Sequence, residues 1–86
     1  MKELKFKIVD KIGLHARPAG ALAAVAKCFK CKIDVFCDGK EADAKRLLSL
    51  MSLGATSGKE LVFKLDGEDE DMAYDAIKTV CYEKLG

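Results

Sequence analysis

The sequence Gly13-Leu14-His15-Ala16-Arg17-Pro18-Ala19 (GLHARPA) contains the only histidine of the chain, its only proline and one of its arginines. Apolar residues follow at every third or fourth position, which predicts a helix that begins near Ala16. His15 is then the N-cap residue. Pro18 falls in the first turn, where its missing N–H removes no helical hydrogen bond, although a residue before proline prefers extended geometry, which puts Arg17 under mild conflict. The apolar positions are Ala19, Leu22, Ala23, Ala26 and Phe29.

A helix N-terminus presents unpaired N–H groups and a partial positive charge, which together favour an anion such as phosphate. The same positive end disfavours imidazolium, so it keeps the ring of His15 neutral and nucleophilic near neutral pH. A phosphoryl group on this ring would meet the N–H groups of Ala16 and Arg17, and the guanidinium of Arg17 would hold it from the side. The residues alone leave a second interpretation open, in which His15 is only a polar cap and Arg17 a solvated cation.

Length and composition favour one small domain over residues 1–86, for which a single hydrophobic core without disulfides or metals is feasible but not large. The net charge of +1 gives no electrostatic case for nucleic acid, and the strands lack the aromatic and basic pattern of RNA-binding sheets. No apolar run approaches the roughly 18 residues that span a bilayer, and the first ten residues alternate in polarity rather than forming a signal-peptide core. We therefore expect a cytoplasmic protein without membrane insertion.

Four cysteines raise the question of a thiol site, because Cys28 and Cys31 have the spacing of metal-binding and redox motifs. No second close pair and no nearby histidine completes four ligands. We expect small apolar side chains in a reducing compartment, with no metal and no cofactor. A thiol-metal or redox module that uses Cys28 and Cys31 stays as a third functional hypothesis.

Alternation of apolar and polar residues predicts half-buried strands over 4–8, 33–37 and 61–65. The pair Asp38-Gly39 is typical of a two-residue hairpin and leads to a short strand over 40–43. Acidic residues over 68–71 complement the dipole of a last helix, and we expect them to cap it. The apolar stripe of that helix is Ala73, Ala76, Ile77 and Val80.

A short second helix ends near Gly54, because glycine is the expected residue just past a helix end. Its apolar residues Leu47, Leu48, Leu50 and Met51 wrap around the axis, so some must be exposed unless all four are core. The order strand, helix, strand, strand, short helix, strand, helix predicts helices on one side of an antiparallel sheet. From order alone, a ferredoxin-like arrangement fits equally well.

GLHARPA resembles the active-site signature of HPr, the histidine-containing phosphocarrier family of the bacterial phosphoenolpyruvate-dependent sugar phosphotransferase system. The segment 45–54 (KRLLSLMSLG) resembles the second helix of that family, and Gly39-Lys40 and the acidic run over 67–70 also stand in family positions. The resemblance spans essentially the whole chain. It implies an α+β open-faced β-sandwich, in which a four-stranded antiparallel sheet carries three helices on one face.

The resemblance also implies a function. Enzyme I, charged by phosphoenolpyruvate, would phosphorylate His15 at Nδ1, and the phosphoryl group would pass to the IIA units of sugar permeases. The chain alone would not catalyse the turnover of any substrate, so it would be a stoichiometric carrier and not an enzyme. Leu47, Leu48 and Met51 would dock both partners, with Gly54 near Arg17, and a monomer is expected because one patch serves two partners.

Two residues depart from the family pattern. Ile12 stands where the family commonly has a small polar residue. Arg46 stands where many Gram-positive HPr proteins have a serine that a dedicated kinase phosphorylates, so we expect this switch to be absent. Both departures give some weight to a second hypothesis, an HPr-like regulatory or interaction module that docks partners without carrying phosphate to sugar.

Overall fold

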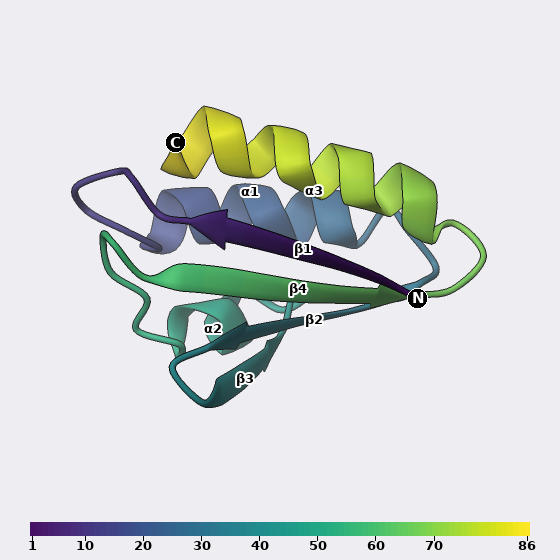
Figure 1. Cartoon of the computed structure of the whole chain (residues 1–86), viewed down its shortest axis with the longest axis horizontal. Coiled ribbons are helices and arrows are strands. Elements are labelled where there is room, and N and C mark those ends of the chain that lie inside the picture. Colours follow the sequence, from purple (N-terminus) through teal and green to yellow (C-terminus); the bar gives the residue numbers. More distant parts are fainter.

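The computed structural model describes all 86 residues as one sheet covered by helices (Figure 1). The strands run in the order β1-β4-β2-β3, and all neighbours are antiparallel. Figure 1 shows α1 and α3 running alongside each other, with the short α2 near the end of the sheet that β2 and β3 form. This is the open-faced sandwich expected from the resemblance. The elements are β1 (Lys2–Lys7), α1 (Ala16–Ala26), β2 (Lys32–Cys37), β3 (Lys40–Asp43), α2 (Leu47–Met51), β4 (Glu60–Asp66) and α3 (Glu70–Leu85).

The register of the sheet explains why one face is covered and the other is open. On the helix-covered face, one row of buried side chains crosses all four strands and consists of Leu4, Phe63, Val35 and Ala42. The neighbouring row faces the other way and consists of Lys5, Val62, Phe36 and Glu41. Each Val, Leu or Phe side chain buried in the first row contributes about 1.5–3 kcal/mol to the stability of the fold. The period of two in the sequence therefore fixes which face the helices cover.

The hairpin between β2 and β3 confirms the strongest turn signal of the sequence. Asp38 and Gly39 have φ angles of 50° and 79°. Positive φ at both central positions is the geometry that matches the twist of two-residue hairpins. The pair therefore sets the register in which Cys37 faces Lys40.

The first helix is shorter than the apolar spacing predicts. It begins at Ala16 as expected but ends at Ala26, so Phe29 and Cys28 lie beyond it rather than within it. Cys28 and Phe29 donate their N–H groups to the carbonyl oxygens of Val25 and Ala26, three residues back. The carboxylate of Asp69 then accepts the N–H groups of Lys30 (2.8 Å) and Cys31 (2.9 Å). The two bonds to Asp69 hold the loop after α1 against the start of α3.

The acidic residues before α3 divide into two roles. Glu70 closes the turn, since its carboxylate accepts the N–H of Gly67 at 3.1 Å. Glu70 and Asp71 lie in the first turn, where the sequence predicts acids that complement the helix dipole. The expected capping is not found, because Asp69 is the N-cap residue by position but its side chain makes no capping bond. The two N–H groups from the loop after α1 lower the pKa of Asp69 below its ordinary value.

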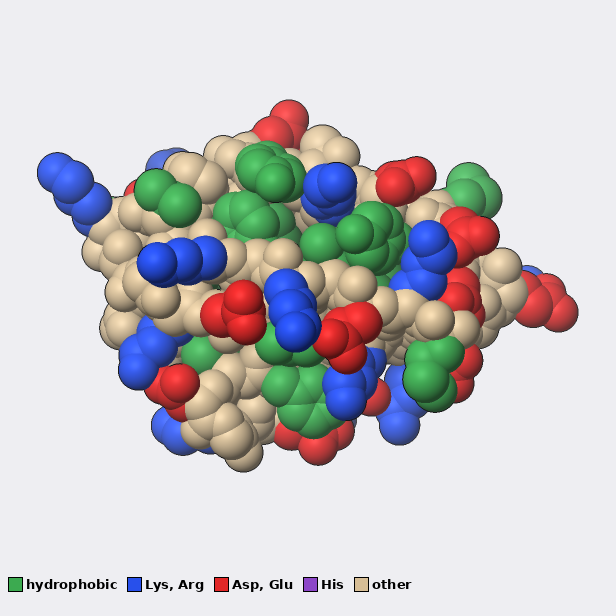
Figure 2. All heavy atoms as spheres, viewed as in Figure 1, with side chains coloured by type: hydrophobic (Ala, Val, Ile, Leu, Met, Phe, Trp, Pro, Cys, Tyr) green, Lys and Arg blue, Asp and Glu red, His purple; other side chains and the backbone are tan.

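The face in Figure 2 shows Lys and Arg side chains interspersed with Asp and Glu around separate hydrophobic groups. This mixed pattern agrees with the net charge of +1 and offers no single-sign patch on that face. None of the helices is both long enough and apolar enough to cross a bilayer.

Candidate functional site

The start of α1 places His15 as the sequence predicts. His15 has an extended backbone (φ −102°, ψ −171°), and its carbonyl oxygen accepts the N–H of Ala19 at 3.0 Å. Its half-buried side chain makes no capping hydrogen bond. The helix therefore begins without using the imidazole, whose nitrogens are left to other chemistry.

The loop that delivers His15 is held from two sides. On one side, the N–H of Leu14 donates to the carbonyl oxygen of Ala55 at 2.9 Å, in the segment that follows α2. Gly13 has a φ of 81°, and a Cβ there would lie 2.8 Å from the same oxygen, so only glycine fits this close approach. On the other side, Val9 and Asp10 both donate their N–H groups to the carbonyl oxygen of Leu85, at 2.8 and 3.0 Å.

A hollow of about 670 Å³ lies beside His15, between the start of α1 with the loop before it and the last turn of α3. It joins the predicted pair His15 and Arg17 with two charged residues of the last turn of α3, Glu83 and Lys84, which the sequence alone does not indicate. No local pattern marks them, because their place depends on how α3 packs against the site loop. The hollow is lined by Asp10, Ile12, His15, Arg17, Pro18, Ala21, Glu83 and Lys84.

The first turn of α1 has free hydrogen-bond donors next to this hollow. The N–H groups of Ala16 and Arg17 make no backbone hydrogen bond. The guanidinium of Arg17 is exposed and has no carboxylate within 4.0 Å. Two N–H groups and a fork of charged donors can therefore hold an anion without breaking an existing contact.

The short helix α2 exposes the residues predicted to dock partners. The exposed fractions are 38% for Leu47, 80% for Leu48 and 40% for Met51, whereas Leu50 is fully buried. The alternative that all four are core is wrong. Gly54 has a φ of 59° and lies three residues beyond Met51, the last residue of the helix.

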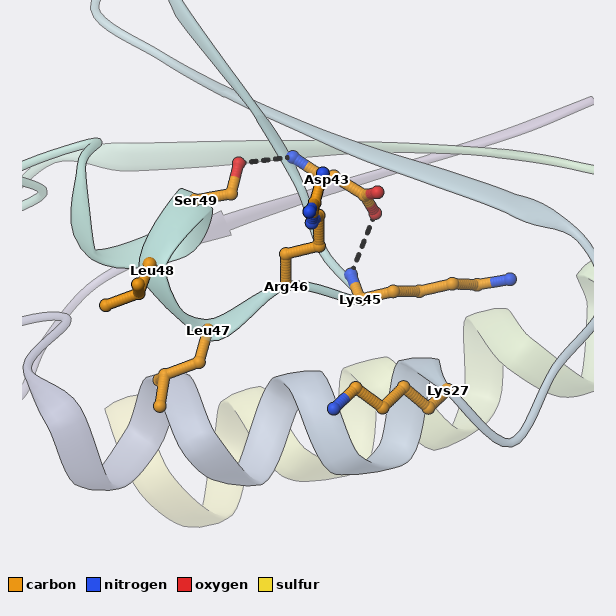
Figure 3. Close-up of a pocket in the computed structure, with 7 residues that line it drawn as sticks. All are labelled: Lys27, Asp43, Lys45, Arg46, Leu47, Leu48 and Ser49. Carbon is orange, nitrogen blue, oxygen red and sulfur yellow. Dashed lines mark hydrogen bonds between the residues drawn. The ribbon is translucent and has the colours of Figure 1, made fainter.

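A second hollow of about 560 Å³ flanks these leucines (Figure 3). Figure 3 shows Leu47 pointing toward α1 and Lys27 extending from the end of that helix. Arg46 is the N-cap residue of α2, exposed and without a capping bond or an ion pair. Met51 and Gly54 line neither hollow. The lining residues are Lys27, Asp43, Lys45, Arg46, Leu47, Leu48 and Ser49.

The base of α2 is fixed by polar contacts of its own. Ser49 Oγ accepts the N–H of Asp43 and the Asp43 carboxylate accepts the N–H of Lys45, both at 2.9 Å. Lys45 Nζ donates to the carbonyl oxygen of Phe29 at 2.8 Å. Of the three cations that line this hollow, Lys27, Lys45 and Arg46, Lys45 therefore already has a hydrogen-bond partner.

The cysteines are all free thiols. Cys31, Cys37 and Cys81 are buried, and burial raises the pKa of the Cys81 thiol to about 12. Only Cys28 is exposed. No three His, Cys, Asp or Glu side chains lie where they could share a metal ion.

An open-faced sandwich whose single histidine begins the first helix is the arrangement expected of a histidine phosphocarrier. A family model described as the "PTS HPr component phosphorylation site" matches residues 2–82. The chain belongs to the HPr family, the phosphocarriers of the phosphotransferase system.

Three relatives illustrate how closely the chain follows this family. The phosphocarrier protein HPr of Mycoplasma genitalium is 41% identical over 85 residues, which cover 98% of this chain and 96% of that protein. The solved histidine-containing phosphocarrier protein of Mycoplasma superimposes with a TM-score of 0.95 at 33% identity, covering 98% and 96% of the two chains. A solved HPr dimer of Thermoanaerobacter tengcongensis has a TM-score of 0.78 at 37% identity, covering 100% and 99%. The HPr arrangement, and not the ferredoxin-like one, is therefore the fold.

Proposed function

We propose that His15 carries a phosphoryl group from enzyme I, charged by phosphoenolpyruvate, to the IIA units of sugar permeases. The observation that supports this most directly is the imidazole itself. It stands at a helix N-terminus, is not used as a cap, and shares a hollow with Arg17. Membership of the HPr family supports the choice of these two partners.

The chemistry needs a neutral ring and moderate stabilisation of the product. The lone pair of Nδ1, the atom implied by the family resemblance, attacks phosphorus. The N–P bond forms as the bond between phosphorus and the donor breaks, and that electron pair leaves with the donor. The N–H groups of Ala16 and Arg17 and the Arg17 guanidinium then hold the phosphoryl oxygens. A tighter site would oppose onward transfer, so an open hollow suits a stoichiometric carrier.

Docking is assigned to the exposed apolar residues of α2 and to the turn that follows it. Leu47, Leu48 and Met51 offer apolar surface that both partners would cover in turn, and Gly54 extends it. Because one surface serves both partners, the carrier would act as a monomer. It would be a single domain over residues 1–86 and would work in the cytoplasm. Size-exclusion chromatography tests the oligomeric state directly, since a solved HPr dimer exists.

The regulatory serine of many family members is replaced by Arg46, which has no hydroxyl group to phosphorylate. We expect a serine kinase of that system to leave the chain unmodified. The Arg46→Ser variant should become a substrate. If the kinase refuses this variant as well, the explanation by one residue is wrong.

The experiment is intact-mass spectrometry after incubation with phosphoenolpyruvate, magnesium and enzyme I. One acid-labile phosphoryl group is expected on the protein and none on His15→Ala. Adding a IIA protein should then discharge it. An unmodified protein beside an active enzyme I, demonstrated on another HPr, would refute the carrier function.

A second function, an interaction module that docks partners without transfer, is favoured by Arg46 and Ile12. Ile12 is 69% exposed and lines the hollow beside His15, where an apolar side chain adds no donor to phosphate. This alternative predicts that a partner binds through α2 and that His15 takes no phosphoryl group from enzyme I. The mass experiment therefore separates the two functions.

A further inference from the structure

We propose that Lys84, in the last turn of α3, is a positioning residue for the phosphoryl group, a second cation beside Arg17. The proposal rests on the proposed function, since it requires a phosphoryl group on His15. Lys84 lines the hollow together with His15 and Arg17, although these residues stand at opposite ends of the sequence.

The place of Lys84 is fixed by its neighbour in the chain. The carbonyl oxygen of Leu85 accepts the N–H groups of Val9 and Asp10, which belong to the loop that leads to His15. Leu85 is also fully buried in the hydrophobic core, so the last turn of α3 is anchored by its side chain as well as by its backbone. Lys84 is exposed beside this contact and is free to reach the open side of the hollow.

The charges of the hollow favour this role once the ring is phosphorylated. Arg17 and Lys84 are balanced by Asp10 and Glu83, and neither cation has a carboxylate within 4.0 Å. A phosphoryl group adds about two negative charges near neutral pH. The balance then becomes negative, and both cations gain an anionic partner that the free protein does not offer.

Lys84 also has an ordinary structural explanation, because a cation in the last turn of a helix complements the helix dipole. This explanation predicts an effect on the stability of α3, with or without phosphate. The positioning role predicts an effect on the phosphorylation equilibrium. A measurement of that equilibrium separates the two.

The experiment follows the equilibrium between phosphoenolpyruvate and His15 with catalytic enzyme I at a high ratio of pyruvate to phosphoenolpyruvate. In the net exchange, which passes through phospho-enzyme I, the O–P bond of phosphoenolpyruvate is broken and the N–P bond of His15 is made, and the released enolate takes a proton to become pyruvate. Intact mass gives the phosphorylated fraction. The equilibrium constant does not depend on how well a variant docks on enzyme I, because the enzyme only catalyses the exchange.

Lys84→Gln should lower this equilibrium constant roughly two- to fivefold, the range of an exposed charge pair. Glu83→Gln should raise it, because it removes a negative charge from the same hollow. Lys78→Gln, an exposed lysine of α3 that does not line the hollow, should leave it unchanged. Both shifts should shrink in about 1 M salt, where the screening length falls to about 3 Å.

The outcomes are distinct. Equal constants for Lys84→Gln, Lys78→Gln and the unmodified protein would overturn the role of Lys84 while His15 remains a carrier. Shifts of the same sign in Lys84→Gln and Glu83→Gln would also overturn it, since that is the mark of a structural change in α3. No phosphoryl group on the unmodified protein, with enzyme I active on another HPr, would refute the proposed function and this inference with it.

Discussion

The starts of α1 and α2 resemble each other in backbone and differ in what they offer to a partner. Both follow a residue in extended conformation that makes no side-chain cap, His15 before α1 and Arg46 before α2. The first opens onto a hollow with two cations and two carboxylates, whereas the second is flanked by exposed leucines. The proposed function places group transfer at the first helix start and docking at the second, so single substitutions should remove one and spare the other.

The largest effect on stability is expected at Gly13, where the loop before α1 contacts the segment that follows α2. Gly13→Ala places a Cβ 2.8 Å from the carbonyl oxygen of Ala55 and keeps a φ of 81°, so it should lower the free energy of unfolding by about 3–4 kcal/mol. Urea unfolding followed by circular dichroism measures this. Gly20→Ala is the matched control, because its Cβ meets nothing within 4 Å, and it should stabilise α1 by about 0.5–1 kcal/mol. Equal stabilities would mean that the loop does not rest on the segment after α2.

The next effect tests whether the two arginines have different roles. Arg17→Ala should slow phosphorylation of His15 about a hundredfold, or about 2.7 kcal/mol, because it removes a charged donor at the transferred group. Arg46→Ala should change the rate less than about threefold, as for an exposed charge at the edge of an interface. Quenched-flow assays with enzyme I give both rates. If the two variants were equally slow, the separation of transfer from docking would be lost.

A smaller effect isolates docking. Leu48→Ala should weaken binding to enzyme I by about 1–2 kcal/mol, because Leu48 is 80% exposed and free to be covered by a partner. The free energy of unfolding of the Leu48→Ala variant should hardly change. Leu50→Ala, at a fully buried position of the same helix, should instead cost about 2–5 kcal/mol of stability. Isothermal titration and urea unfolding separate the two, and a Leu48 variant that binds normally would move the docking surface elsewhere.

The smallest effect lies at the far end of α1 and depends on pH. The pKa of Asp69 is lowered from its ordinary 3.8 because its carboxylate accepts the N–H groups of Lys30 and Cys31. A carboxylate with a lowered folded-state pKa adds stability above pH 3.8, and this contribution disappears as the pH falls through the folded-state pKa.

The measurement is urea unfolding of the unmodified protein and of Asp69→Asn between pH 7 and pH 2. The unmodified protein should be the more stable near neutral pH, and the gap should close in the acid range. A gap that does not change with pH would show that the ionised carboxylate is not what holds the loop.

Local patterns were enough to predict most elements of this fold. Period-two alternation located β1, β2 and β4, and Asp38-Gly39 located the hairpin, because these signals depend on neighbours within a few residues. The loop that follows α1 could not be predicted in this way, since it is held by Asp69, 38 residues beyond Cys31. The strand order came from the resemblance and not from the periodicity.

The candidate site divides in the same way. His15 and Arg17 were found from a contiguous sequence, and the structure brings them to one hollow. Glu83 and Lys84 share that hollow only because Leu85 bonds to Val9 and Asp10, a contact that no pattern within α3 indicates. Which apolar residues of α2 are exposed also required the packed structure, because periodicity on a five-residue helix does not define one face.

The unequal exposure of the four thiols makes the protein ready for single-site labelling. Cys28 is exposed, whereas burial raises the pKa of Cys31, Cys37 and Cys81 and leaves them with little reactive thiolate. A maleimide fluorophore should therefore attach at one position without any engineered cysteine. That position lies beyond the C-terminal end of α1, which is roughly 16 Å long, so the dye would sit at the opposite end of the helix from the imidazole. Energy transfer from this dye would follow partner arrival while His15 stays open.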